Sequence, residues 1–170
     1  GKMVEVVTGR KLGQVMHDDL FGPLGMDSTG FRLTPAMRAR MARVHHRRED
    51  GSLVADLKRE VPQDPEFEAG GGGLYSTAND YLKFVRMVLD DGRSARGEVV
   101  MKPGTVDAMA ANAMGDSTVS LLKTVMPALS KDAEFFPGIT KQWGLSFLIN
   151  NEEAPTGRSA GSLCWAGLPN

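Results

Sequence analysis

The chain has 170 residues, 41% of them apolar, and a formal net charge of −1, which fits one ordinary globular domain. A nearly neutral charge creates no long-range field for nucleic acid or anionic lipid, so we expect neither as a partner. The single cysteine, Cys164, excludes an internal disulfide, and no apolar run reaches the roughly 20 residues that span a bilayer. We therefore expect no membrane partner, with the cytoplasm favoured and the periplasm possible for a parent with an exported N-terminus.

Both ends of the chain have the character of an internal piece of a longer protein. Residues 1–8 start inside an amphipathic helix without an initiator methionine, and residues 164–170 stop without a terminal element. We expect the remainder of the same parent chain to be needed to complete the fold.

The first elements are predicted to be two short helices, over residues 2–8 and 11–21, because their apolar residues recur at helical spacing. Gly22 and Pro23 are expected to end the second helix, since neither continues a helix comfortably. Thr34-Pro35 is expected to begin a further helical turn, with proline at the first helical position.

A basic stretch follows, over residues 38–48. We expect a solvated helix face, because no aromatic residue interleaves with the charges and nearby acids neutralise them. An anion or nucleic-acid patch is the less favoured alternative. The basic residues are Arg38, Arg40, Arg43, His45, His46, Arg47 and Arg48.

The most informative stretch runs from residue 68 to residue 92. Four glycines, 70–73, precede Ser76 and Thr77, one of which is expected to cap a helix; with Thr77 as the cap, Asp80 is the third helical residue. Gly92 stands where a left-handed residue would end that helix. One face is predicted to be an apolar stripe, and its residues are Tyr81, Phe84, Val85, Val88 and Leu89.

The second half of the chain is predicted to contain one helix, one long loop and two strands. Pro103 is expected to begin the helix, and residues 115–142 lack a sustained period, as in a loop that forms a pocket wall. Residues 143–149 form the best strand pattern, and residues 162–168 the second best.

Gly-x-Ser-x-Gly occurs around Ser159 and would fit the nucleophile elbow of an α/β-hydrolase. That motif requires a turn from a buried strand into a helix, with the histidine later in the chain. Here a polar loop comes before it, a strand-like run follows, and all three histidines lie upstream. A hairpin turn is the preferred interpretation.

No metal or other cofactor is expected. A single cysteine and the adjacent pair His45 and His46 do not make a zinc spacing. Residues 70–73 do not match a dinucleotide-binding loop, and Glu98 stands where a phosphate-binding loop needs lysine.

The string Gly-Gly-Gly-Gly-Leu-Tyr-Ser-Thr-Ala-Asn-Asp-Tyr-Leu-Lys-Phe, residues 70–84, resembles the serine β-lactamase and penicillin-binding-protein-like family. Phe-Gly-Pro-Leu-Gly-Met at residues 21–26 is similar to that family's Pro-Leu-Gly-Met turn. Trp-Ala-Gly at residues 165–167 sits where β-lactamases carry Lys-Thr-Gly, and it looks like the family VIII carboxylesterase branch.

The resemblance implies acyl transfer through a covalent acyl-enzyme. The family's nucleophile is the serine of Ser-x-x-Lys, assisted by that lysine and a tyrosine. We expect all three upstream of Gly1. Ser120 has a lysine at the right spacing, Lys123, but it lies in the long loop and is interpreted as a coincidence.

By the same resemblance, this chain supplies the substrate wall. The backbone N–H of Leu168 is the implied oxyanion donor, and Trp165, Ala166 and Gly167 are the implied substrate-binding residues. Trp165 in place of lysine removes a cation that would hold a substrate carboxylate, so we expect neutral esters to be favoured over penicillins.

The predicted fold is a mixed α/β (α+β) fold of the β-lactamase/transpeptidase type, an antiparallel sheet flanked by helices with an all-helical lobe. Residues 1–114 are assigned mainly to the helical lobe, 115–142 to a pocket loop and 143–170 to sheet strands. The predicted function is a serine carboxylesterase for short-chain or small aromatic acyl esters. The alternatives are a class C-like β-lactamase or D-Ala peptidase, and a non-catalytic binding protein of the same fold.

Overall fold

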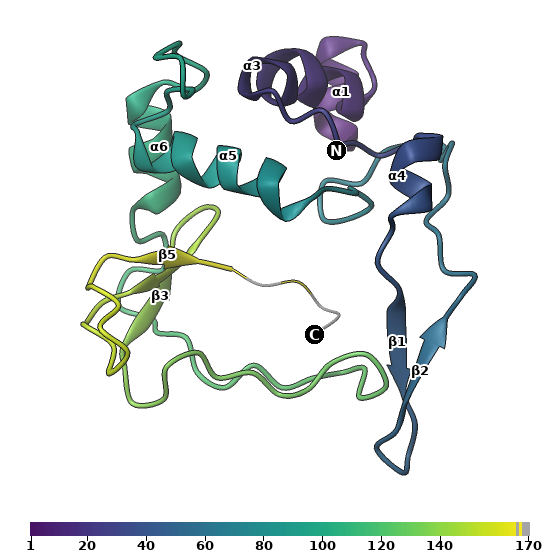
Figure 1. Cartoon of the computed structure of the whole chain (residues 1–170). Coiled ribbons are helices and arrows are strands. Elements are labelled where there is room, and N and C mark those ends of the chain that lie inside the picture. Colours follow the sequence, from purple (N-terminus) through teal and green to yellow (C-terminus); the bar gives the residue numbers. More distant parts are fainter. Residues whose placement is uncertain (166, 168–170) are drawn as a thin grey trace. The chain divides into compact units, whose positions relative to one another are not determined.

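The computed structural model describes residues 1–165 and residue 167 (Figure 1). They form two compact units. Unit 1 comprises Gly1–Ala42 and Lys58–Pro103, and unit 2 comprises Arg43–Leu57 and Gly104–Asn170. Both helices and small antiparallel sheets are present, so the predicted mixed α/β architecture is confirmed. In the part of the chain that is described, no helix combines the length and the hydrophobicity needed to cross a membrane.

Unit 1 is helical. The predicted helices at its start are present, but the second continues past residue 21 and stops at Gly25, whose φ of 67° is left-handed. The elements are α1 (Lys2–Thr8), α2 (Leu12–Met16), the π-helical η1 (His17–Phe21), α3 (Gly22–Leu24), α4 (Pro35–Ala39) and α5 (Ala78–Leu89).

The prediction that Gly22 and Pro23 end the second helix is therefore wrong. At this point the hydrogen-bond pattern of the helix widens by one residue, since the Gly22 N–H donates to the His17 carbonyl five residues back. Pro23 then falls in the first turn of α3, the part of a helix where proline is tolerated. A β-carbon at Gly22 would lie 3.0 Å from the same carbonyl oxygen, so glycine suits the wide turn.

Helix α5 has the predicted boundaries. The Thr77 hydroxyl accepts the N–H of Asp80, and Gly92, with φ of 85°, donates to the Met87 carbonyl just past the helix end. The orientation of the helix differs from the predicted apolar stripe. Its buried residues are Asp80 and Met87, whereas Tyr81 and Leu89 are exposed.

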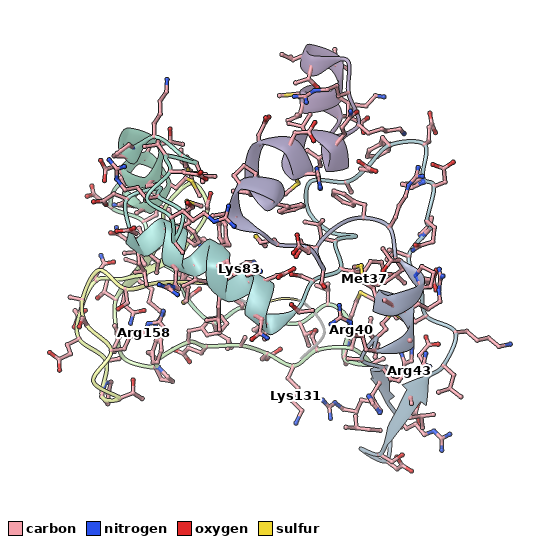
Figure 2. The ribbon with its side chains drawn as sticks, turned by 45° about the horizontal axis from the view of Figure 1, so that its top comes forward. Met37, Arg40, Arg43, Lys83, Lys131 and Arg158 are labelled. Carbon is pink, nitrogen blue, oxygen red and sulfur yellow. The ribbon has the colours of Figure 1, made fainter. Side chains whose placement is uncertain are left out.

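The buried face of α5 is polar at its N-terminal end, around Asp80, because that end receives the loop that follows α3, whereas Met87 is buried further along the helix. The Asp80 carboxylate accepts from the Ser28 N–H at 2.8 Å and from the Thr29 hydroxyl at 3.0 Å. Lys83, one turn along the helix in Figure 2, donates to Asp80 at 3.0 Å and to the Gly25 carbonyl. These bonds attach α5 to the end of α3, which lies beside it in Figure 1.

Unit 2 begins with a hairpin of β1 (Val44–Arg47) and β2 (Leu53–Asp56), so the helix expected over residues 38–48 ends at Ala39. A helix would have stacked the basic residues three and four apart, and like charges at that spacing repel. In the strand they alternate between two faces instead. The two strands are joined by a turn at Asp50-Gly51, where Gly51 has φ of 82° and its N–H donates to the Arg48 carbonyl.

The rest of unit 2 contains α6 (Pro103–Ala110), which begins at the predicted proline, and a sheet of β3 (Lys141–Trp143), β4 (Leu148–Asn150) and β5 (Leu163–Cys164). The single strand predicted over residues 143–149 is wrong, because the chain turns at Gly144. A β-carbon there would overlap the carbonyl oxygen of Met109, so only glycine fits where the chain reverses. The second predicted strand is shorter than expected.

The segment before this sheet is the predicted long loop. Leu122 and Ala133 pair across it, and buried Lys141 donates to the carbonyls of Phe136 at 3.0 Å and Ile139 at 2.6 Å. A buried ammonium group requires such partners. The loop therefore reaches β3 with residues 136–139 held in place.

Candidate functional site

The predicted wall residues lie at the end of β5. Trp165 follows the strand directly and is 53% exposed, and Gly167 has open space where a β-carbon would stand. Ala166 and Leu168 lie outside the described residues. The role of the Leu168 N–H as an oxyanion donor therefore stays a prediction, as does the assignment of Ala166 to the wall.

The Trp165 ring packs against two other aromatic rings, neither of which was singled out from the sequence. Trp143 of β3 meets it edge to face, with ring centroids 4.4 Å apart and planes at 68°. Phe135, from the long loop, lies on it at 6.3 Å with planes at 55°. Such tilted arrangements are the favourable ones for aromatic pairs. We call Phe135, Trp143 and Trp165 the aromatic wall.

The backbone around Trp143 is fixed from the segment after α6. The Ala113 N–H donates to the Trp143 carbonyl at 2.7 Å, and the Trp143 N–H lies 3.2 Å from the Met114 sulfur. The sheet register sets Trp143 opposite Leu148, which is fully buried and in turn pairs with Cys164. The wall therefore rests on a packed sheet, and not only on loops.

The basic side chains near the wall are engaged elsewhere. The Arg158 guanidinium lies 5.6 Å from the Phe136 ring centroid and donates to the Leu163 carbonyl at 2.6 Å (Figure 2). Lys141 is buried against backbone carbonyls. Both cations therefore make these contacts with groups other than the Trp165 ring.

Cys164 lies half-buried beside this surface. Burial raises the pKa of its thiol, against a smaller lowering by the charge of Arg158. A thiol with a raised pKa is a poor nucleophile at neutral pH.

The serines considered as nucleophiles are not in catalytic surroundings. Ser159 lies in the turn from β4 to β5, between Gly157 and Gly161, both with left-handed φ. This is the hairpin turn that the sequence favoured, and no helix follows it among the described residues. Ser120 and Lys123 are both exposed in the long loop.

Comparison with known proteins agrees with these observations. Residues 1–170, the whole chain, match the family model described as Beta-lactamase. The chain belongs to the beta-lactamase family. This confirms the resemblance that residues 21–26 and 70–84 carry.

Among its relatives, protein Rv1367c of Mycobacterium tuberculosis is 35% identical over 117 residues, which are 68% of this chain and 29% of that protein. Monacolin J acid methylbutanoyltransferase of Aspergillus terreus is 30% identical over all of this chain and 42% of that protein. Lovastatin esterase of Penicillium rubens is 28% identical over 98% of this chain and 42% of that protein.

A solved structure shows the same fold. Unliganded simvastatin synthase (LovD) from Aspergillus terreus superposes with a TM-score of 0.73 and 27% identity, over 98% of this chain and 41% of that chain. The β-lactamase/transpeptidase-like fold predicted from the sequence is thus confirmed. This chain spans less than half the length of each of these relatives.

Proposed function

We propose that the protein transfers the acyl group of a neutral carboxylic ester through a serine acyl-enzyme, with this chain supplying the wall on which the acyl group lies. Short-chain or small aromatic acyl groups are the proposed substrates. Relatives named as an acyltransferase and as an esterase support acyl-enzyme chemistry of this kind.

The observation that carries the proposal is the uncharged aromatic wall. Trp165 follows β5 directly, and its ring packs on Trp143 and Phe135. By the resemblance to the family, we assign it to the position of the lysine of Lys-Thr-Gly. A substrate carboxylate placed there would lose water without gaining a cation, which is costly. A neutral acyl chain would instead exchange water for aromatic carbon.

The proposed reaction has two steps. A serine of the parent chain attacks the ester carbonyl, and the alcohol leaves with a proton, so that the acyl group becomes bound to the serine. Water, or a second alcohol, then takes the acyl group and returns the proton to the serine. Water as acceptor makes the protein an esterase, and an alcohol acceptor makes it an acyltransferase. We propose hydrolysis as the main reaction.

The proposal is tested by restoring the cation. In the full-length protein, Trp165→Lys should raise turnover of a penicillin relative to turnover of p-nitrophenyl butyrate, by about tenfold or more if the new ammonium group pairs with the substrate carboxylate. Leu145→Lys is the matched control, because Leu145 is exposed in the turn between β3 and β4 and the change adds the same charge without replacing a residue of the wall. An unchanged ratio in Trp165→Lys would refute the proposal.

The alternatives predict other results. A class C-like β-lactamase or D-Ala peptidase would turn over a penicillin or an acyl-D-Ala-D-Ala peptide faster than any simple ester before mutation. A non-catalytic member of the family would bind such ligands and release no product.

A further inference from the structure

A pocket of about 360 Å³ lies in unit 2, and none of its lining residues belongs to the aromatic wall. It is formed by the β1–β2 hairpin and the turn around residue 128, which are joined by the Arg47 N–H donating to the Ala128 carbonyl at 2.9 Å. That turn is closed by the Leu129 N–H donating to the Met126 carbonyl at 2.9 Å. The lining residues are Arg43, Val44, His45, Arg47, Leu53, Ala128 and Leu129.

The strand places the basic side chains of this pocket together. Residues two apart share one face of a strand, so His45 and Arg47 lie on the same side of β1, and Arg43, the residue before the strand, lines the same pocket. The register sets Leu53 of β2 directly opposite Arg47. The His45 ring is held by a 3.1 Å hydrogen bond between its Nδ1 and the Arg43 carbonyl. One side of the hairpin is thus basic and is bordered by apolar carbon.

Two acidic residues of the hairpin, Asp56 and Asp50, form hydrogen bonds with residues that do not line the pocket. Asp56 lies on the opposite face, where His46 Nε2 is 2.9 Å from its carboxylate. Asp50 accepts the Ser52 N–H in the turn. None of the described lining residues is acidic, and Arg47 Nε is buried without a hydrogen-bond partner. A buried donor of this kind favours an acceptor from a ligand.

We propose that this pocket binds a carboxylate that carries an apolar chain, such as a medium-chain fatty acid. Arg47 and Arg43 would donate to the two carboxylate oxygens, since guanidinium groups match that planar geometry. Leu53, Ala128 and Leu129 would cover the first carbons of the chain. The volume lies within the range of small-molecule pockets. The pocket uses no residue of the aromatic wall, so this proposal goes beyond the proposed function and does not depend on it.

The test is a ligand-observed NMR titration of the full-length protein with octanoate, without any ester substrate. We expect saturable binding that tightens from hexanoate to octanoate, by up to about fourfold per added methylene. Octanamide, which has the same chain without the charge, should bind at least about tenfold more weakly. Inorganic phosphate separates the contribution of charge from that of the apolar chain, because it binds the cations and has no carbon chain. It should bind more weakly than octanoate.

Two variants assign the binding to this pocket. Arg47→Gln should weaken octanoate binding by about tenfold or more. Leu53→Glu should abolish octanoate binding, because the new carboxylate stands opposite Arg47 and pairs with its guanidinium group in place of the ligand. Leu53 is 57% exposed, so this change should leave the fold intact.

Arg48→Gln is the control, because it removes the neighbouring positive charge from an exposed side chain outside the pocket. It should leave octanoate binding unchanged. Equal binding of octanoate and octanamide, equal or tighter binding of phosphate, or full octanoate binding in both pocket variants would overturn the proposal. Loss of ester turnover with octanoate binding intact would refute the acyl-transfer proposal alone.

Discussion

Asp80 is a buried residue of unit 1 whose replacement should lower the folding stability although the side chain hardly changes shape. It is 5% exposed, and one carboxylate oxygen accepts from both Ser28 and Thr29 while the other accepts from Lys83. Asp80→Asn keeps the volume. If the amide oxygen stays with Ser28 and Thr29, the amide NH₂ faces the Lys83 ammonium group, donor against donor.

The expected cost follows from these bonds. A hydrogen bond to a charged group contributes about 1.5–3 kcal/mol, and a neutral acceptor also weakens the two bonds that remain. We therefore expect Asp80→Asn to lower the stability of unit 1 by about 2–4 kcal/mol. If opening of the loop tracks that loss, the Ser28 amide should exchange about 30-fold faster or more.

The loss should depend on pH. Burial would raise the pKa of Asp80, but the bonds from Lys83, Ser28 and Thr29 outweigh it and hold the pKa below its ordinary value of 3.8. A lowered pKa in the folded state contributes stability that is complete above the unfolded value and is lost as pH falls through the folded one. The difference between wild type and Asp80→Asn should thus be full at pH 7 and shrink below about pH 4.

Hydrogen exchange followed by mass spectrometry, on peptides covering residues 26–31 and 78–89, measures this directly. Asp90→Asn is the control, since Asp90 is exposed at the C-terminal end of α5, where a negative charge is unfavourable. It should change stability by less than about 0.5 kcal/mol. Equal exchange in wild type and Asp80→Asn would refute the account of the buried face of α5.

Three further predictions concern single sites. Gly92→Ala should destabilise the protein far more than Gly97→Ala, as measured by urea unfolding: both have left-handed φ, but only at Gly92 would a β-carbon overlap a backbone carbonyl. Trp143→Ala leaves Trp165 as the one tryptophan of residues 1–170, and we expect the emission that disappears on further replacing Trp165 by Phe to lie to the red, because the ring has lost its cover; an unshifted difference spectrum would argue against the aromatic wall. Cys164 should react with iodoacetamide at pH 8 more slowly than in urea-unfolded protein, because burial raises the thiol pKa; equal rates would contradict that burial.

Elements with local signals could be predicted from the sequence. The cap at Thr77 and the left-handed Gly92 depend on residues within one or two helical turns, so the bounds of α5 follow from the string itself. The family assignment belongs to the same class, since residues 21–26 and 70–84 carry it within short runs.

Elements that are fixed by partners far along the chain could not be predicted from the sequence. Residues 44–47 form a strand because they pair with residues 53–56 and bond to Ala128, about 80 residues away, and a basic string gives no sign of that. The aromatic wall joins Phe135 of the long loop, Trp143 of β3 and Trp165, which follows β5. The burial of the polar residue Asp80 in α5 has a similar cause, because its carboxylate bonds to a loop about 50 residues upstream.

The most direct test of the central claim is labelling of the full-length protein with a fluorophosphonate, followed by intact-mass measurement and peptide mapping. The account predicts one adduct, on a serine outside residues 1–170, with labelling slowed by an excess of a short-chain ester. An adduct on Ser159 or Ser120 would contradict it, because the nucleophile would then lie in a turn or loop of this chain. No adduct at all would contradict it equally, since acyl transfer requires an activated serine.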